Sequence, residues 1–138
     1  LAMAFHQRQQ CDSAMPYFRK VVQMTKSVLG AASRYYVADC LLQQQQLKEA
    51  ERAAFEVIRS TPSYDYWIAR AYVLLGDIFA AEKDYFNAKA TLQSVVDNCQ
   101  IPEIRDSARQ KLQQVIAAEQ ASSKIMRNPS STDTLSHP

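Results

Sequence analysis

The stretch ARAYVLLGDIF, residues 69–79, has the apolar spacing of a helix, yet a glycine lies in its interior. Tyr72, Leu75, Gly76 and Phe79 recur at steps of three and four residues, which places them on one helical face. A glycine in a helix interior costs about 1 kcal/mol relative to alanine. Because the chain has only two glycines, Gly76 indicates a packing or functional reason.

A second amphipathic helix follows at once, in the segment AEKDYFNAKATLQSVV. Asp84 is of the residue type that caps helix N-termini. Ala88, Leu92 and Val95 follow it on one helical face. The sequence therefore predicts two helices joined by a short turn over residues 64–98, and neither helix can bury its apolar face alone.

The same arrangement recurs upstream, in RYYVADCLLQQQQLKEAERAAFEVIRSTP, residues 34–62. The equivalent alanines are Ala14, Ala50 and Ala88, spaced 36 and then 38 residues apart. Self-similarity at this length is typical of repeat proteins, in which each unit needs its neighbours to complete a core. We therefore predict an all-α array of antiparallel helical hairpins.

These residues resemble the tetratricopeptide repeat family. Its pattern runs aromatic, two residues, Leu-Gly, two residues, aromatic, then a later Ala and a closing Pro. The residues that match it best are Tyr72, Leu75, Gly76, Phe79, Ala88 and Pro102. In the middle repeat Ala38 replaces the glycine, Leu41 replaces the aromatic residue, and Pro62 closes the unit. The resemblance covers roughly residues 1–102 and implies a right-handed solenoid, in which the small residue faces a neighbouring helix at close range.

The resemblance divides the chain into a repeat domain at residues 1–124 and a polar C-terminal tail at 125–138. The domain comprises a truncated first repeat, a middle repeat, a third repeat and a capping helix with a polar outer face, at about 1–30, 31–64, 69–102 and 103–124. Leu1 falls partway through the first helix of its pair, so we expect a longer parent protein and an open end that favours self-association.

In tetratricopeptide arrays the first helix of each pair lines a concave groove that holds peptide. The resemblance implies exposed groove positions at Tyr35, Tyr36, Asp39, Leu42, Gln43, Arg70, Val73, Leu74, Asp77 and Ala81, with His6 and Gln7 equivalent in the first repeat. Chaperone-binding members grip a C-terminal carboxylate with Lys and Asn. Those positions hold Tyr35, Asp39, Val73 and Asp77 here, so we expect no carboxylate clamp. Tyrosines beside Arg70 and two aspartates suit a ligand bound by aromatic stacking and a few oriented hydrogen bonds.

The sequence offers no catalytic or metal-binding motif. Three cysteines lie far apart without a CxxC pair, and we expect three small buried thiols. The two histidines lie near opposite ends, and HExxH, GxSxG and glycine-rich phosphate-loop patterns are missing. We therefore expect a non-enzymatic protein without metal or cofactor. The net charge of +2, with both signs interspersed, argues against a nucleic-acid partner, and no window approaches the roughly 20 apolar residues of a membrane span.

Three functions remain open from the sequence. The first is a scaffold that binds a peptide or partner protein in the groove, and the second is a spacer within a longer solenoid. The third is RNA binding, which the few basic groove residues disfavour. The sequence of residues 66–98 is similar to sequences in long tetratricopeptide proteins of bacterial cell envelopes. This similarity favours a parent protein of the bacterial cell envelope and leaves a cytoplasmic one open.

Two aromatic or polar segments have alternative interpretations. Tyr64, Tyr66 and Trp67 form either an aromatic binding patch or the packed end of a helix. We expect the tail at 128–138 to lie against a protein surface, either its own or that of a second copy. The groove and the convex face are the two surfaces open to it.

Overall fold

The computed structural model describes residues 2–24, 28–59 and 65–127 of the 138-residue chain. These residues form six helices and no strand, so the all-α prediction is confirmed. The helices are α1 (Ala2–Met24), α2 (Val28–Gln43), α3 (Leu47–Arg59), α4 (Asp65–Ala81), α5 (Tyr85–Asn98) and α6 (Pro102–Arg127). None of these six helices is long and apolar enough to cross a membrane.

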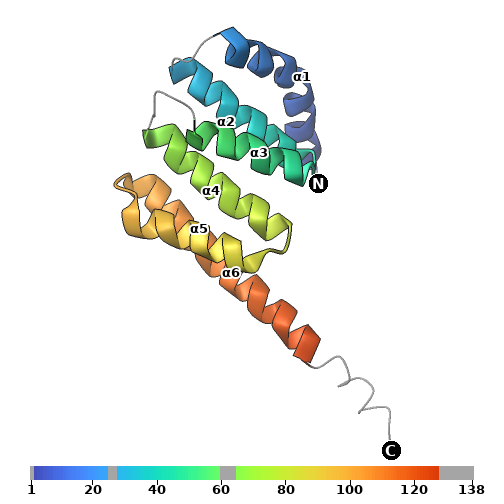
Figure 1. Cartoon of the computed structure of the whole chain (residues 1–138). Coiled ribbons are helices and arrows are strands. Elements are labelled where there is room, and N and C mark those ends of the chain that lie inside the picture. The colour runs from blue at the N-terminus through green and yellow to red at the C-terminus, as the bar shows by residue number, and fades with distance from the viewer. Residues whose placement is uncertain (1, 25–27, 60–64, 128–138) are drawn as a thin grey trace, which may run out of the picture.

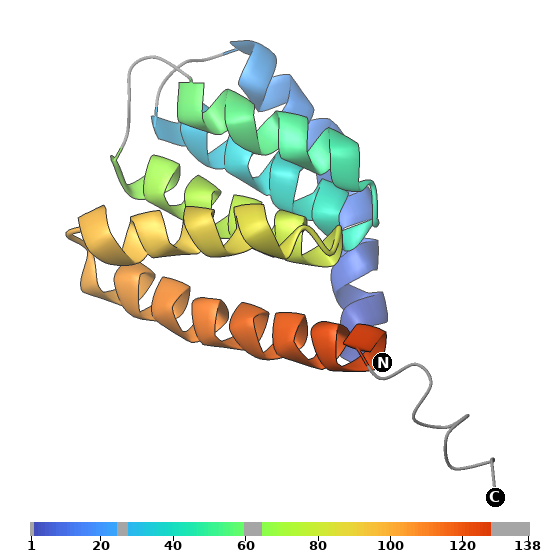
Figure 2. The same ribbon diagram turned by 60° about the horizontal axis from the view of Figure 1, so that its bottom comes forward.

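The helices follow one another as stacked antiparallel hairpins (Figure 1). Each helix packs against the next one along the chain, and α4 additionally contacts both α2 and α6. The helices α2, α4 and α6 therefore lie in one row, and α3 and α5 pack onto that row without touching each other in the described part of the chain. Figure 2 shows the succession from the α2–α3 hairpin to the α4–α5 hairpin and then α6. The right-handed course of the solenoid stays a prediction.

The turns after α2 and after α4 have the same pattern of backbone hydrogen bonds. Gln45 and Lys83 occupy equivalent turn positions and both have a φ of 62°, a region that non-glycine residues rarely adopt. In the second turn Asp84 caps α5, because its side chain accepts a hydrogen bond from the Asn87 backbone N–H at 3.2 Å. The predicted N-cap is thus present.

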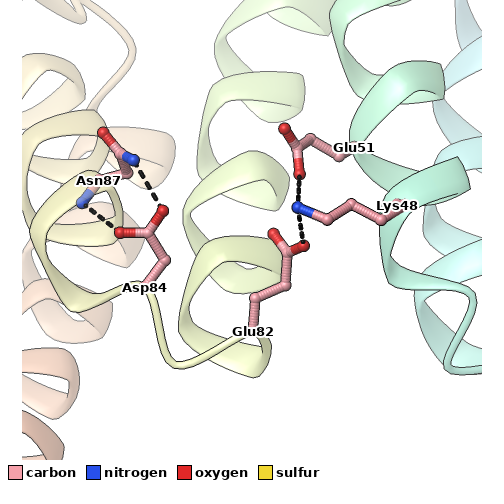
Figure 3. A network of polar contacts seen from close by, with 5 residues as sticks. All are labelled: Lys48, Glu51, Glu82, Asp84 and Asn87. Carbon is pink, nitrogen blue, oxygen red and sulfur yellow. Dashed lines mark hydrogen bonds and ion pairs between the residues drawn. The ribbon is translucent and has the colours of Figure 1, made fainter.

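Lys48 at the start of α3 contacts the turn that follows α4 (Figure 3). Its Nζ lies 2.9 Å from a carboxylate oxygen of Glu82 and 3.5 Å from one of Glu51. The Glu82 side chain is only 11% exposed, so the ammonium compensates a nearly buried carboxylate. Hydrogen bonding to Glu82, with the charge of Glu51, raises the pKa of Lys48. This contact fixes the turn after α4 against the preceding hairpin.

Gly76 of α4 faces the side chain of Leu92 in α5. A Cβ at this position would lie 2.6 Å from both Cγ and Cδ2 of Leu92, whose side chain is fully buried. Ordinary carbon–carbon contacts are about 3.5–4.0 Å. Ala38 takes the equivalent place in α2 and is also fully buried. The helix therefore contains a glycine because the α5 leucine fills the space that a side chain would need.

The N-terminal end differs from the prediction of a truncated hairpin. Residues 2–24 form one continuous helix, with Pro16 inside it, instead of a helix end, a turn and a second helix. In the described part of the chain α1 packs against α2 alone. The good helix formers Arg8, Gln9 and Gln10 continue the helix through this segment.

The expectation of three thiols is also wrong, because Cys11 and Cys40 form a disulfide. They are 29 residues apart in sequence, so no local motif indicates the bond. The packing of α1 on α2 brings their Cα atoms to 5.3 Å, within the range that a disulfide spans. Only Cys99 is a free thiol, and it is half-buried.

The last helix extends beyond the predicted capping segment at 103–124. Pro102, expected to close the third repeat, is the first residue of α6, where its fixed φ suits a helix start and its missing N–H costs nothing. Lys89 of α5 holds the distal half of α6 through an ion pair with Glu119 at 2.7 Å. Residues 128–138 lie outside the described residues, and the prediction for the tail lies there with them.

Candidate functional site

A cavity of about 570 Å³ opens along the row formed by α2, α4 and α6. Of the ten groove positions expected in the middle and third repeats, seven line it, namely Tyr35, Asp39, Gln43, Arg70, Val73, Leu74 and Asp77. The remaining lining residues are Tyr66, Glu103, Ile104, Ser107 and Lys111. The structure therefore brings the predicted positions together at one cavity.

Several predicted groove positions differ from expectation in exposure or place. Tyr35, Val73 and Leu74 are buried instead of exposed, with relative exposures of 7, 8 and 4%. Each lies between neighbouring helices of the row, so only a small part of its surface reaches the cavity. Tyr36 and Leu42 are half-buried and pack against the core outside the cavity lining.

Two further predicted places are separate from the cavity. Ala81 is exposed at the end of α4 and takes no part in the lining. His6 and Gln7 belong to α1, but their side chains lie outside the part of the chain that the structure describes.

Arg70 is held by aromatic residues of α2 and α4. Its guanidinium carbon lies 4.4 Å from the centroid of the Tyr35 ring and 5.4 Å from that of Trp67, within the range of cation–π attraction. The guanidinium donates hydrogen bonds to the hydroxyls of Tyr35 at 3.3 Å and Tyr66 at 3.5 Å. Among the described residues, no carboxylate lies within ion-pair distance of it. Arg70 is therefore a positioned donor whose charge no acidic side chain directly neutralises.

The aromatic segment that precedes Arg70 is both packed and part of the cavity wall. Trp67 is half-buried against the core and contacts Tyr35, Tyr36 and Tyr66 at centroid distances of 5.6, 5.8 and 4.9 Å. Tyr66 is 45% exposed and lines the cavity. The packed-end interpretation thus holds for Trp67, whereas Tyr64 lies outside the described residues.

An ion pair closes the other end of the cavity. Lys111 of α6 donates to both carboxylate oxygens of Asp77, at 3.1 and 2.9 Å. About a third of each side chain is exposed, 34% for the lysine and 32% for the aspartate. Asp39, one helix away on α2, accepts a hydrogen bond from Gln43 but has no ion pair within the described ranges.

Burial dominates the protonation chemistry of the cavity. It raises the pKa values of both Asp39 and Asp77, and hydrogen bonding from Lys111 opposes the shift at Asp77 without cancelling it. Burial also raises the pKa of Tyr35 to about 12, although Arg70 opposes that shift. Burial therefore makes the charged form of both carboxylates less favourable, and additional hydrogen-bond donors from a ligand would reduce that cost.

The matched family agrees with this arrangement. Residues 66–99, from the start of α4 to the end of α5, match the tetratricopeptide repeat family. The chain contains a tetratricopeptide repeat. No curated protein and no solved structure matches the chain. Tetratricopeptide repeats are in general protein–protein interaction modules, which suggests protein partners. The similarity to bacterial envelope proteins stays a prediction.

The tetratricopeptide register also explains the residues that sequence reasoning missed. Lys111 follows Asp77 by 34 residues, which is the length of one repeat. Counting one repeat forward from Asp77 would have found it, because α6 occupies the place of the first helix of a further pair. The prediction of a capping helix assigned no groove position to this segment, and Lys111 was therefore not predicted.

The opposite side of α6 differs from that of α4. One repeat length after Leu75 and Gly76, which pack against α5, α6 has Arg109 and Gln110. Both are exposed, whereas Leu75 and Gly76 are buried. The role of α6 as a cap stays a prediction.

Metal chemistry finds no support in the described ranges. No three His, Cys, Asp or Glu side chains among the described residues gather closely enough to hold a metal ion. The cavity thus offers aromatic faces, an arginine, a lysine–aspartate pair and a second aspartate, which are groups that bind by stacking and hydrogen bonding.

Proposed function

We propose that this chain is a non-enzymatic protein-interaction scaffold that binds an extended peptide of a partner protein along α2, α4 and α6. The observation that carries the proposal is the convergence of aromatic and charged side chains from three helices on one open cavity of about 570 Å³. Ligand sites in proteins commonly have volumes of about 300–1,000 Å³. The tetratricopeptide repeat within the chain supports a protein partner over other ligands.

The polar groups of the cavity match the chemistry of an extended peptide backbone. Arg70 presents N–H donors held in place by Tyr35 and Tyr66, and Asp39 presents a half-buried acceptor without an ion pair among the described residues. A peptide backbone offers a carbonyl acceptor and an N–H donor at each residue, Pro excepted. One extended segment can therefore satisfy both side chains.

The aromatic surface adds a side-chain preference. Tyr66 is partly exposed at the cavity and Tyr35 forms part of its wall. Tyrosine rings contribute apolar contact area and stack on aromatic or planar groups. We expect the bound peptide to place an apolar or aromatic side chain against Tyr66, next to the backbone segment that reaches Arg70.

Selection of peptides tests the proposal against the alternative of a spacer that binds nothing. A phage library of random-sequence peptides is panned against the oxidised wild-type protein, and the Kd of an enriched peptide is measured by fluorescence anisotropy. Arg70→Gln and Asp39→Asn should each weaken binding roughly tenfold or more.

Arg52→Gln on α3 is the matched control, because Arg52 is exposed on a helix outside the cavity lining. It should leave Kd unchanged. A selection that enriches no peptide would favour the spacer, and equal Kd values for the Arg70→Gln and Arg52→Gln proteins would place the binding elsewhere.

A further inference from the structure

The helix α1 is joined to the rest of the structure through α2 alone in the described part of the chain. The Cys11–Cys40 disulfide joins the two helices covalently. One residue further along α1, Asp12 accepts a hydrogen bond from the Gln44 side chain at 2.7 Å, but this contact is exposed. The disulfide is therefore the strongest single connection between α1 and the helices that form the cavity.

The non-covalent packing of α1 is weaker than that of the equivalent helix in the next hairpin. Ala14 and Val21 repeat Ala50 and Val57 of α3 at a constant offset of 36 residues. Ala50 and Val57 have relative exposures of 0 and 1%, whereas Ala14 and Val21 are only half-buried. Because less apolar area is removed from water, α1 depends more than α3 on a covalent link.

A chain of aromatic contacts joins α1 to the cavity. Phe18 of α1 stacks on Tyr36 of α2 with centroids 5.4 Å apart. Tyr36 contacts Trp67 at 5.8 Å and Tyr35 at 5.4 Å. Both Trp67 and Tyr35 lie against the Arg70 guanidinium, at 5.4 and 4.4 Å from ring centroid to guanidinium carbon. A displacement of α1 removes the first ring of this series and frees Tyr36 to move.

We propose that the Cys11–Cys40 disulfide is a redox-controlled link that holds α1 in place and thereby sets the peptide affinity of the cavity. This inference rests on the function proposed above. Reduction takes two electrons and two protons from a dithiol, which becomes a disulfide, while the protein S–S bond breaks and two thiols form. Both cysteines are buried, with exposures of 9 and 4%, so the reductant reaches them when α1 opens locally.

This control would confine tight peptide binding to oxidising surroundings, where such disulfides persist. The oxidised form holds the aromatic series together and presents Arg70 in its bound geometry. In the reduced form only non-covalent contacts hold α1, so α1 and the aromatic residues next to it are less ordered. Peptide binding must then order these aromatic residues, which lowers the affinity. The expected coupling lowers peptide affinity roughly tenfold, within the usual range for linked sites.

The test compares the oxidised full chain with the same protein treated with dithiothreitol. Three quantities are measured: the Kd of a phage-selected peptide, hydrogen exchange of the α1 amides, and the fluorescence of Trp67, which is the one tryptophan of the chain. Reduction should raise Kd roughly tenfold, speed exchange in α1 and change the Trp67 emission. Unchanged Kd with the disulfide shown to be reduced overturns the proposal.

Cysteine variants separate the disulfide from general effects of the reductant. Cys99→Ser removes the free thiol and keeps the disulfide, so it should respond to dithiothreitol as the wild type does. Cys11→Ala with Cys40→Ala should show the reduced behaviour with or without reductant. A response of that double variant to dithiothreitol contradicts the assignment, and if it fails to fold, reduction of the wild type still decides.

The readouts also separate this inference from the function on which it rests. If no peptide binds the oxidised protein, the proposed function fails. Hydrogen exchange in α1 and Trp67 fluorescence then still show whether the disulfide controls the aromatic series. Unchanged values of both on reduction refute the link independently of any peptide.

Discussion

Replacing Gly76 by alanine sets two effects of opposite sign against each other. Alanine has the better helix propensity by about 1 kcal/mol. The new Cβ, however, would lie 2.6 Å from Leu92 Cγ and Cδ2 and 3.2 Å from Cδ1, roughly 1 Å inside ordinary carbon–carbon contact. Overpacking of this kind costs about 1–3 kcal/mol. We predict that Gly76→Ala lowers the free energy of unfolding by about 1 kcal/mol, because the fully buried Leu92 cannot move into solvent.

The sign of the effect should reverse when the obstructing side chain is removed. Leu92→Ala alone costs about 2–5 kcal/mol through the cavity that it leaves. In that background Gly76→Ala meets open space, so it should raise the free energy of unfolding by about 1 kcal/mol. Urea unfolding followed by circular dichroism gives all four values of the double-mutant cycle. If Gly76→Ala stabilises the wild-type background as well, the close approach of α4 and α5 is not the reason for the glycine.

Three further predictions concern the cavity and the second turn. Lys111→Met removes the donor that opposes the burial shift at Asp77 and so raises the pKa of Asp77 further. The folded state then keeps this proton to a higher pH than the unfolded state does. As pH rises from about 4 towards neutrality, the free energy of unfolding, measured by urea unfolding at each pH, should therefore fall more steeply in this variant than in the wild type. Tyr35 should ionise at about pH 12 in an ultraviolet titration, so the wild type should lose stability between about pH 10 and 12, and Tyr35→Phe should remove both signals. Asp84→Ala deletes the hydrogen bond to the Asn87 backbone and should cost about 1 kcal/mol in the same unfolding assay, whereas a cost near zero would contradict the cap.

The fold was predictable to the extent that one repeat carries its own signal. The apolar period of residues 64–98 and the interior glycine predicted α4 and α5. Burial of one helical face requires apolar residues at helical spacing, and close contact between helices requires a small residue. Local residues did not predict α1. The glutamine-rich segments before Ala14 and before Ala50 are similar, yet only the second contains a turn. The surroundings of each segment, and not its local residues, therefore decide between a turn and a continuous helix.

The candidate site was predictable in position but not in its contacts. The repeat register placed Tyr35, Asp39, Arg70 and Asp77 on helices that form one row, and these residues line one cavity. The register says nothing about burial, so Tyr35 was expected to be exposed although it is 7% exposed. Pairings between different repeats, such as the Cys11–Cys40 bond, depend on how helices meet in space and leave no local pattern.

The most direct test of the central claim is to map the bound peptide on the protein by NMR. Amide chemical shifts of the oxidised chain are recorded with and without a phage-selected peptide. Binding along the cavity predicts that the largest shift changes fall on α2, α4 and the first half of α6, at residues such as Asp39, Arg70 and Lys111. Changes confined to the outer faces of α3 and α5, or no changes at all, would contradict the peptide-binding cavity.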